Sequence, residues 1–121
     1  MAIGGIRRGD VVLARMPGDK ARPSVVVRSN LLAELPYVTI LPITSHVRAL
    51  SKLRLDVAMG ESTGLRLPSQ VMVDWPQTIR VAQIGGVIGA LDATTMEAIT
   101  RTLAVVLGIG TVPSRPGAKE V

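Results

Sequence analysis

Short apolar runs alternate with turn residues along most of the chain, and this pattern predicts a small fold built mainly of β-strands. Pro23 is acceptable as the first residue of a strand, because a missing N–H there costs no ladder bond. Pro42 is expected to bend or end a later strand, and the Gly85-Gly86 pair to weaken or bulge the last one. Many short strands at close spacing favour a small barrel or sandwich. The predicted strands cover residues 11–14, 23–29, 37–45, 53–57, 69–75 and 79–91.

The hydrophobic period changes to that of a helix near the C-terminus. A helix is predicted over residues 93–107, with Asp92 as its N-cap and Gly108 as its stop. A single helical turn, capped by Asn30, is expected within the stretch 30–35. The apolar residues of the long helix recur at intervals of three and four and form one stripe: Met96, Ile99, Leu103 and Val106.

The composition limits the size, the core and the location of the protein. Residues 1–110 are predicted to form one domain, and residues 111–121, with few core-forming side chains, a flexible tail. Tyr37 and Trp75 are the only aromatic residues, so the core must be aliphatic. The sequence has no cysteine, which is compatible with a reducing cytoplasm. No apolar run is long enough to span a bilayer and none resembles a secretory signal, so we expect a soluble, cytoplasmic protein.

The charge and the residue types restrict the chemistry. Fourteen Lys and Arg against nine Asp and Glu leave a formal net charge of +5, and eleven of the fourteen cations are arginine. This excess favours polyanions, and the planar fork of arginine suits bidentate contacts to phosphate. One histidine, no cysteine and no pair of acids at helical spacing support neither a metal cluster nor a Ser/His/Asp triad. Any catalysis would therefore use arginine, hydroxyls and one acid, and no cofactor is predicted.

Four motifs then follow one another in a recognisable order. They are RRGDVVLARMPGDKARPSVVVRSN from residue 7, VTILPITS from residue 38, PSQVMVDW from residue 68 and GGVIGALDATTMEAITRTLAVVLG from residue 85. In order and spacing they resemble the MazF/PemK family of toxin endoribonucleases from bacterial toxin–antitoxin pairs. The family pattern has R-G-[DE] before the first strand, R-P opening the second, P-[IL]-[ST]-[ST] ending the third, a Q-V strand and a closing helix. The resemblance covers Arg7–Leu107.

The resemblance implies a fold, an activity and partners. The fold is mainly β with a C-terminal α-helix, a small SH3-like β-barrel of the CcdB/MazF type, assembled as a symmetric homodimer. The activity is sequence-specific cleavage of single-stranded RNA, such as mRNA, by attack of the substrate's own 2′-hydroxyl without a metal. The protein partner is a cognate antitoxin, whose acidic, disordered C-terminal segment would fold over the basic groove.

The resemblance also implies catalytic roles for three residues. Arg22 matches the arginine of R-P and Thr44 the threonine of P-I-T-S, and fixed donors of this kind stabilise the charge that builds up on a phosphorane. Asp74 matches the acid of an Arg-x-Asp that has acid and base roles in the PemK branch. Met72 replaces the arginine of that motif, so a general-acid role cannot be carried over to its position. The short connection between the first two strands, MPGDKA, also departs from many family members and leaves the RNA sequence open.

Seven further residues are predicted to bind the substrate, and most have a structural interpretation as well. Trp75 and Gln77 could stack on and read an unpaired base, but Trp75 could equally pack at the dimer interface. His46 is a candidate acid or base, or a solvated loop residue. Thr44 can also be a turn former, and Asp74 a turn or salt-bridge residue. Either a phosphate track or a solvated face is formed by four cations, Arg48, Lys52, Arg54 and Arg66. The seven residues are Lys20, Ser45, His46, Arg48, Gln70, Trp75 and Gln77.

Two other classes of function stay open at this point. A CcdB-like inhibitor of DNA gyrase would share the barrel and act by protein binding, although the polar end of the chain, without tryptophan, disfavours that mode. A non-catalytic nucleic-acid-binding module would explain the charge without any catalytic group.

Overall fold

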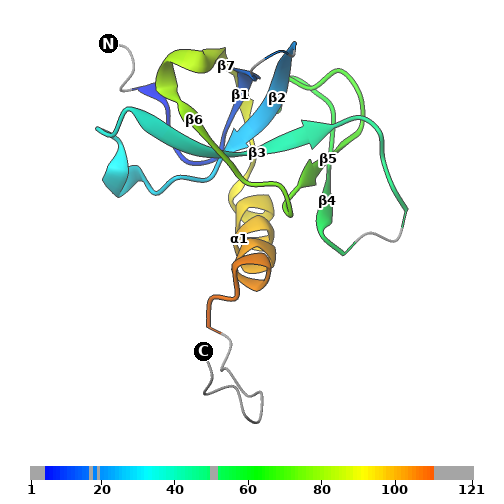
Figure 1. Ribbon diagram of the computed structural model, residues 1–121. Coiled ribbons are helices and arrows are strands. Elements are labelled where there is room, and N and C mark those ends of the chain that lie inside the picture. Colours follow the sequence, from blue (N-terminus) through cyan, green and yellow to red (C-terminus); the bar gives the residue numbers. More distant parts are fainter. Residues whose placement is uncertain (1–4, 17, 19, 50–51, 111–121) are drawn as a thin grey trace.

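The fold of the computed structural model, described here for residues 5–16, 18, 20–49 and 52–110, is mainly β with one C-terminal helix (Figure 1). This confirms the predicted fold class. The predicted tail, residues 111–121, and two residues of the first turn, Pro17 and Asp19, lie outside the described residues. The strands are β1 (Asp10–Arg15), β2 (Ala21–Val26), β3 (Tyr37–Thr44), β4 (Arg54–Val57), β5 (Ser69–Met72), β6 (Gln77–Arg80) and β7 (Ile84–Ala90); the 3-10 turns are η2 (Asn30–Leu32) and η3 (Val81–Gln83), and the helix is α1 (Ala93–Leu107).

The strands form one antiparallel sheet that curls into the predicted barrel-like shape. Its order is β4-β5-β3-β2-β1-β7, and β6 pairs with the first half of β3. The edge strands β4 and β7 do not pair with each other in the described part of the chain. The turn that follows β4 meets β7 instead, where the Ala90 N–H donates a hydrogen bond of 2.8 Å to the Ser62 carbonyl. A turn, rather than a ladder, therefore closes the sheet.

Strand β3 does not end at Pro42, which is a partial correction of the sequence prediction. Its first half, Tyr37–Ile40, pairs with β6, whereas Ile43 and Thr44 pair with β5. Pro42 lies between these two halves and faces Ser24 of β2. The change of partner places Thr44 beside β5, which in turn pairs with β4.

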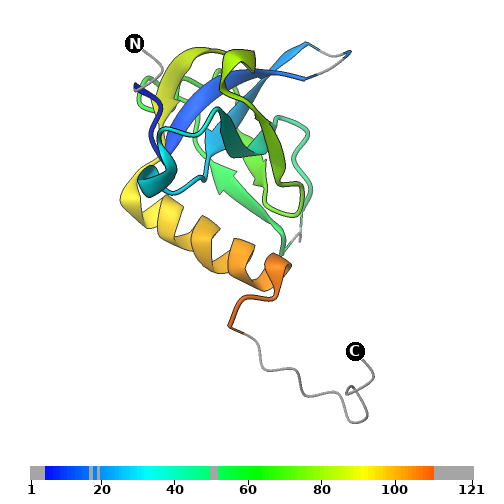
Figure 2. The same cartoon turned by 60° about the vertical axis from the view of Figure 1, so that its left-hand side comes forward.

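Both faces of the central strands are buried, because alternate side chains enter two aliphatic clusters. Val11, Val25 and Leu41 pack in one cluster with Ile99 of α1. Their chain neighbours point the other way, and the second cluster includes Val12, Val26 and Ile40. Figure 2 shows α1 running beneath the strands, and its Ile99 belongs to the first cluster. The predicted helical stripe packs here: Ile99 is fully buried, and Met96, Leu103 and Val106 contact the cluster.

Two local predictions were wrong in detail. Pro23 is the third residue of β2, and the ladder to β3 begins only at Ser24, so the missing N–H falls before that pairing starts. Ser29, not Asn30, caps η2 by accepting from the Leu31 N–H. The Asn30 side chain accepts from the Arg8 N–H instead, at 2.8 Å. Serine and asparagine are both favoured at N-caps, so residue type alone does not tell which of the two caps the turn.

The last predicted strand is in fact two strands, β6 and β7, separated by η3. The predicted irregularity near Gly85-Gly86 is confirmed, since the pairing of β1 with β7 skips Gly85. A second shift skips Ile88. The sequence AMGESTGL at residues 58–65 is typical of an exposed turn, but its Thr63 and Leu65 are buried against the barrel. No helix in the described ranges is long and apolar enough to cross a membrane.

The helix cap gives a prediction about stability and pH. Hydrogen bonding to the Thr95 hydroxyl and, second, to its backbone N–H lowers the pKa of Asp92 below its ordinary 3.8. Asp92→Ala is expected to lower the thermal midpoint by a few degrees at pH 7, because an orphan N–H loses its acceptor. A carboxylate with a lowered folded-state pKa stabilises the fold above its unfolded pKa, and this contribution is lost as pH falls through the folded value.

Thermal unfolding of the wild type, Asp92→Ala and Asp92→Asn across pH tests this expectation. The difference between the wild type and Asp92→Ala should shrink below about pH 4, whereas asparagine should cap the helix at every pH. A difference that is unchanged at low pH would contradict the role of the carboxylate charge.

Candidate active site

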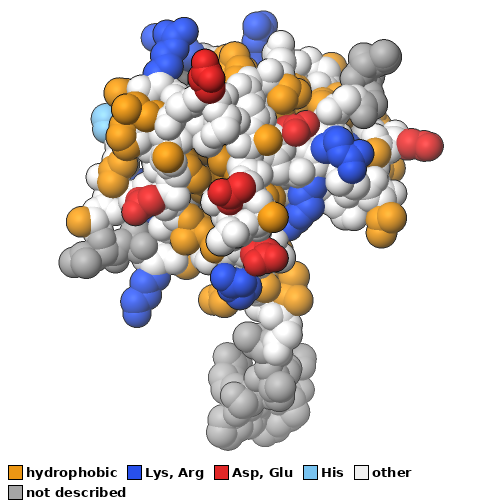
Figure 3. Space-filling model, turned by 180° about the vertical axis from the view of Figure 1, so that it is seen from behind, with side chains coloured by type: hydrophobic (Ala, Val, Ile, Leu, Met, Phe, Trp, Pro, Cys, Tyr) orange, Lys and Arg blue, Asp and Glu red, His pale blue; other side chains and the backbone are white. Residues whose placement is uncertain are grey.

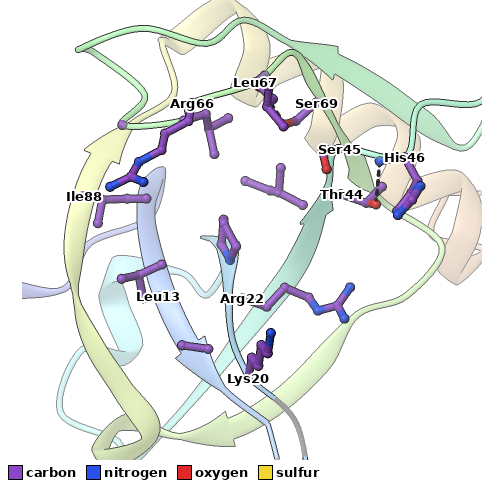
Figure 4. Close-up of a pocket in the computed structure, with 15 residues that line it drawn as sticks. Leu13, Lys20, Arg22, Thr44, Ser45, His46, Arg66, Leu67, Ser69 and Ile88 are labelled. Atoms are coloured by element: carbon purple, nitrogen blue, oxygen red, sulfur yellow. Dashed lines mark hydrogen bonds between the residues drawn. The ribbon is translucent and has the colours of Figure 1, made fainter.

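A cleft of about 530 Å³ opens between the β1–β2 hairpin, the end of β3 and the turn after β4. Its floor is apolar, and its rim carries cations and hydroxyls (Figure 4). The polar and charged residues that line it are Lys20, Arg22, Thr44, Ser45, His46, Arg66 and Ser69.

Arg22 and Thr44 come together because of the register between β2 and β3. The ladder between these antiparallel strands ends with Ser24 paired to Pro42, and Arg22 and Thr44 each lie two residues beyond that pair, at the same end of the ladder. Both side chains line the cleft, and the Arg22 guanidinium points toward the wall that carries Thr44 (Figure 4). The guanidinium and the hydroxyl predicted from two separate motifs therefore share one site.

The Thr44 hydroxyl is held in a defined orientation. The side chain is only 9% exposed, and its Oγ1 accepts a hydrogen bond of 3.0 Å from the backbone N–H of His46. A hydroxyl that accepts one bond still has its own proton to donate. Thr44 can therefore donate to an oxygen atom in the cleft without leaving its place in the strand.

The cleft is positively charged. Lys20, Arg22 and Arg66 line it, and no Asp or Glu is among its described lining residues. The face of the molecule seen in Figure 3 carries both acidic and basic side chains. Arg66 lies on the wall opposite Thr44, near Ile88 (Figure 4). Cations on two walls of an apolar hollow favour an anion that extends across it.

Five of the ten predicted site residues line the cleft and five do not. Lys20, Arg22, Thr44, Ser45 and His46 line it together. Asp74 and Trp75 lie in the exposed turn between β5 and β6, and Gln77 begins β6, where it pairs with Ile40. Arg48 and Gln70 also lie outside the lining.

Gln70 binds the neighbouring loop through its side-chain amide. Its Oε1 accepts from the Arg48 N–H at 2.9 Å, and its Nε2 donates to the Arg48 carbonyl at 3.0 Å. The same Nε2 donates to Oδ1 of Asp56 at 2.9 Å. Gln70 is 4% exposed, and it stands opposite Thr44 in the ladder between β3 and β5. In this structure the amide positions the loop after Thr44.

Gln70→Leu is therefore expected to loosen that loop. Leucine has a similar volume but removes the hydrogen bonds from the amide to the Arg48 backbone, and each such bond contributes roughly 0.5–1.5 kcal/mol to the folding free energy. Chemical denaturation measures the loss, and amide hydrogen exchange should show faster exchange at Arg48. Gln77→Leu, the same replacement at a half-exposed position of β6, is the control and should change neither. Unchanged exchange at Arg48 would show that the amide does not hold the loop.

Sequence reasoning missed part of the cleft. The sequence indicates for Arg66 only a phosphate track or a solvated face, and it does not single out Ser69. Both residues nevertheless line the cleft. Ile88 also contributes, from the second bulge of β7. The only signal in the sequence is the turn at residues 58–65, in which Gly64 allows a close approach to β7. In the described part of the chain, no three His, Cys, Asp or Glu side chains gather as a metal site would require.

Comparisons with known proteins agree with this geometry. The family model for the PemK-like, MazF-like toxin of type II toxin–antitoxin systems matches residues 7–107. The chain belongs to this family. The resemblance seen in the sequence is thereby confirmed, and the matched range includes every residue that lines the cleft.

Individual relatives of this MazF-like chain support the assignment. Endoribonuclease MazF3 of Mycobacterium tuberculosis is 37% identical over 86 residues, which cover 70% of this chain and 81% of the relative. Among solved structures, the Mycobacterium tuberculosis toxin MazF-mt6 has a TM-score of 0.72 at 31% identity, covering 83% of this chain and 97% of that one. A mycobacterial endoribonuclease in complex with its cognate antitoxin shares the fold, with a TM-score of 0.71 at 21% identity over 88% of this chain and 96% of that one.

Proposed function

We propose that the protein is the toxin of a toxin–antitoxin pair and cleaves single-stranded RNA, such as mRNA, in the cytoplasm. The observation that carries the proposal is the juxtaposition of Arg22 and Thr44 in a cationic cleft of a MazF-like chain. The name of the relative MazF3, an endoribonuclease, supports the same activity.

The proposed reaction is an in-line transfer within the RNA itself. The 2′-oxygen forms a bond to phosphorus, the bond from phosphorus to the 5′-oxygen breaks, and the products are a 2′,3′-cyclic phosphate and a 5′-hydroxyl. Negative charge builds up on the non-bridging oxygens in the transition state. Arg22 supplies a forked cation and Thr44 a fixed hydroxyl donor to these oxygens, which is the stabilisation available without a metal.

The cleft also suggests how the substrate and the antitoxin bind. A volume of about 530 Å³ with cations on two walls suits a short stretch of unpaired RNA, held by its phosphates. An acidic segment of an antitoxin would compete for the same cations. The complex of a mycobacterial endoribonuclease with its cognate antitoxin is consistent with such a partner, and we include the predicted homodimer in this proposal.

Cleavage of defined RNA in EDTA tests the proposal. The purified protein should cut single-stranded RNA to fragments with 2′,3′-cyclic phosphate and 5′-hydroxyl ends, and sequencing of the 5′ ends locates the cut. An oligonucleotide with one 2′-deoxy nucleotide at that position is the control and should stay intact.

The alternative functions give different results in the same experiment. Binding of RNA without cleavage under any condition would indicate a non-catalytic module. DNA breaks that appear only in the presence of gyrase would indicate a gyrase inhibitor. Either result would overturn the proposed activity.

A further inference from the structure

We propose that His46 is the general base that removes the proton from the attacking 2′-hydroxyl. This inference rests on the proposed function and adds to it the group that receives the proton. It also revises the expectation from the sequence, in which Asp74 was the acid of the catalytic set.

The chemical types of the residues around the cleft support this role for His46. Lys20, Arg22 and Arg66 are cations, and a guanidinium or ammonium that binds phosphate does not accept a proton at the same time. The hydroxyls of the cleft are weak acids and equally weak bases near neutral pH. No carboxylate is among the described lining residues, and Asp74 lies in an exposed turn outside it. An imidazole is the side chain best suited to exchange a proton near neutral pH.

The position of His46 is fixed from two sides. Its backbone N–H donates to Thr44 Oγ1 at 3.0 Å, so the hydroxyl that would contact the phosphate also sets the start of the loop. Two residues later, the backbone N–H and carbonyl of Arg48 are both bound by the buried side chain of Gln70. The segment between these two anchors carries the His46 side chain to the cleft, beside Thr44 and facing Arg22 (Figure 4).

The charged groups around His46 are cations on the cleft side. Lys20 and Arg22 face it from the start of β2, and Arg66 from the opposite wall. Arg48 follows on its own loop, and Asp56 lies behind that loop with its Oδ1 bonded to Gln70. These cations attract the scissile phosphate to the imidazole, and the carboxylate that is near the loop is engaged away from the cleft.

Neutral imidazole takes the proton of the 2′-hydroxyl as the bond from the 2′-oxygen to phosphorus forms, and His46 becomes an imidazolium. The 5′-oxygen leaves with the electron pair of the breaking bond and receives a proton from water, because the cleft is open to solvent. The imidazolium then returns its proton to water, and the enzyme is regenerated.

His46→Gln is the test variant, and Val47→Gln, the same replacement at the next exposed residue, is its control. Loss of a general base is expected to lower kcat by about 10²–10⁴-fold. Binding of the 2′-deoxy oligonucleotide should stay within about twofold of the wild type, because the phosphate-binding cations remain. The acid limb of the profile of kcat/KM against pH should be present in the wild type and absent in the variant. Val47→Gln should behave as the wild type.

Two further measurements separate a proton-transfer role from a structural one. Free imidazole should restore part of the activity of His46→Ala in proportion to its concentration, which a loss of packing would not allow. A substrate with sulfur in place of the 5′-oxygen needs no protonation of its leaving group. The defect of His46→Gln should persist with this substrate if His46 is the base.

The outcomes distinguish the two proposals. If the wild type leaves RNA intact, the proposed function fails. If the wild type cleaves RNA and His46→Gln cleaves equally well, the inference about His46 fails and the function stands. A slow variant without imidazole rescue, or one whose defect disappears with the sulfur leaving group, would also overturn the assignment of His46 as the base.

Discussion

Replacement of Arg22 by alanine is expected to abolish most of the RNA cleavage while leaving the fold intact. Removal of one donor aimed at the developing charge typically lowers kcat by about 10²–10³-fold. Arg22 is exposed at the rim of the cleft and lies near the start of β2, so its truncation leaves the aliphatic clusters unchanged. Single-turnover cleavage measures the chemical step, and thermal unfolding checks the fold.

Two further variants make this expectation specific to the guanidinium. Arg22→Lys keeps a positive charge but loses the fork, and should retain an activity between those of the wild type and the alanine variant. Arg101→Ala removes one positive charge from an exposed position on α1, away from the cleft, and should cleave as the wild type does. Full activity in Arg22→Ala would contradict the proposed role, whereas an equal loss in Arg101→Ala would indicate a general effect of charge.

The pairing of Arg22 with Thr44 could be predicted from the sequence because it depends on neighbouring strands. Each residue stands at a fixed distance from a proline in its strand, and strands that follow one another along the chain are commonly neighbours in the sheet. Two recognisable motifs then suffice to place both side chains at one edge of the sheet. The helix could be predicted equally well, because its hydrophobic period, its N-cap at Asp92 and its stop at Gly108 are all local signals in the sequence.

The remaining site residues could not be placed in this way, because their positions depend on how distant segments pack. Gln70 and Trp75 belong to one predicted strand, residues 69–75. However, β5 ends at Met72 and the chain then turns, so only Gln70 stays beside Thr44. Even there, its amide is engaged by the Arg48 backbone, a contact between residues 22 positions apart. Arg66 reaches the cleft only because the turn that carries it packs against β7.

That packing depends on two glycines whose lack of a side chain allows backbones to meet. Gly64 has a φ of +75° and faces the Ile88 carbonyl so closely that a Cβ there would overlap it. Gly89 lies on the β7 side of this contact between the turn and β7, which we call the seam. Backbone atoms of Thr63 and Ser62 occupy the space where a Cβ of residue 89 would lie, and the Ser62 carbonyl oxygen would be 2.6 Å from that Cβ. Neither neighbour is the flexible end of a side chain, so relief would require one segment to move.

Gly89→Ala is accordingly expected to destabilise the fold by roughly 1–3 kcal/mol or more, the range found when extra atoms are forced into a packed region. Gly86→Ala, in the same strand, is the matched control, since nothing lies within 4 Å of its Cβ and its φ is ordinary for an alanine. Denaturant unfolding should separate the two variants clearly. Because the seam also sets the wall that carries Arg66, any folded Gly89→Ala should bind RNA more weakly than Gly86→Ala. Equal stability of the two variants would mean that the turn can withdraw from β7 at little cost, and the barrel would then not depend on this seam for its closure.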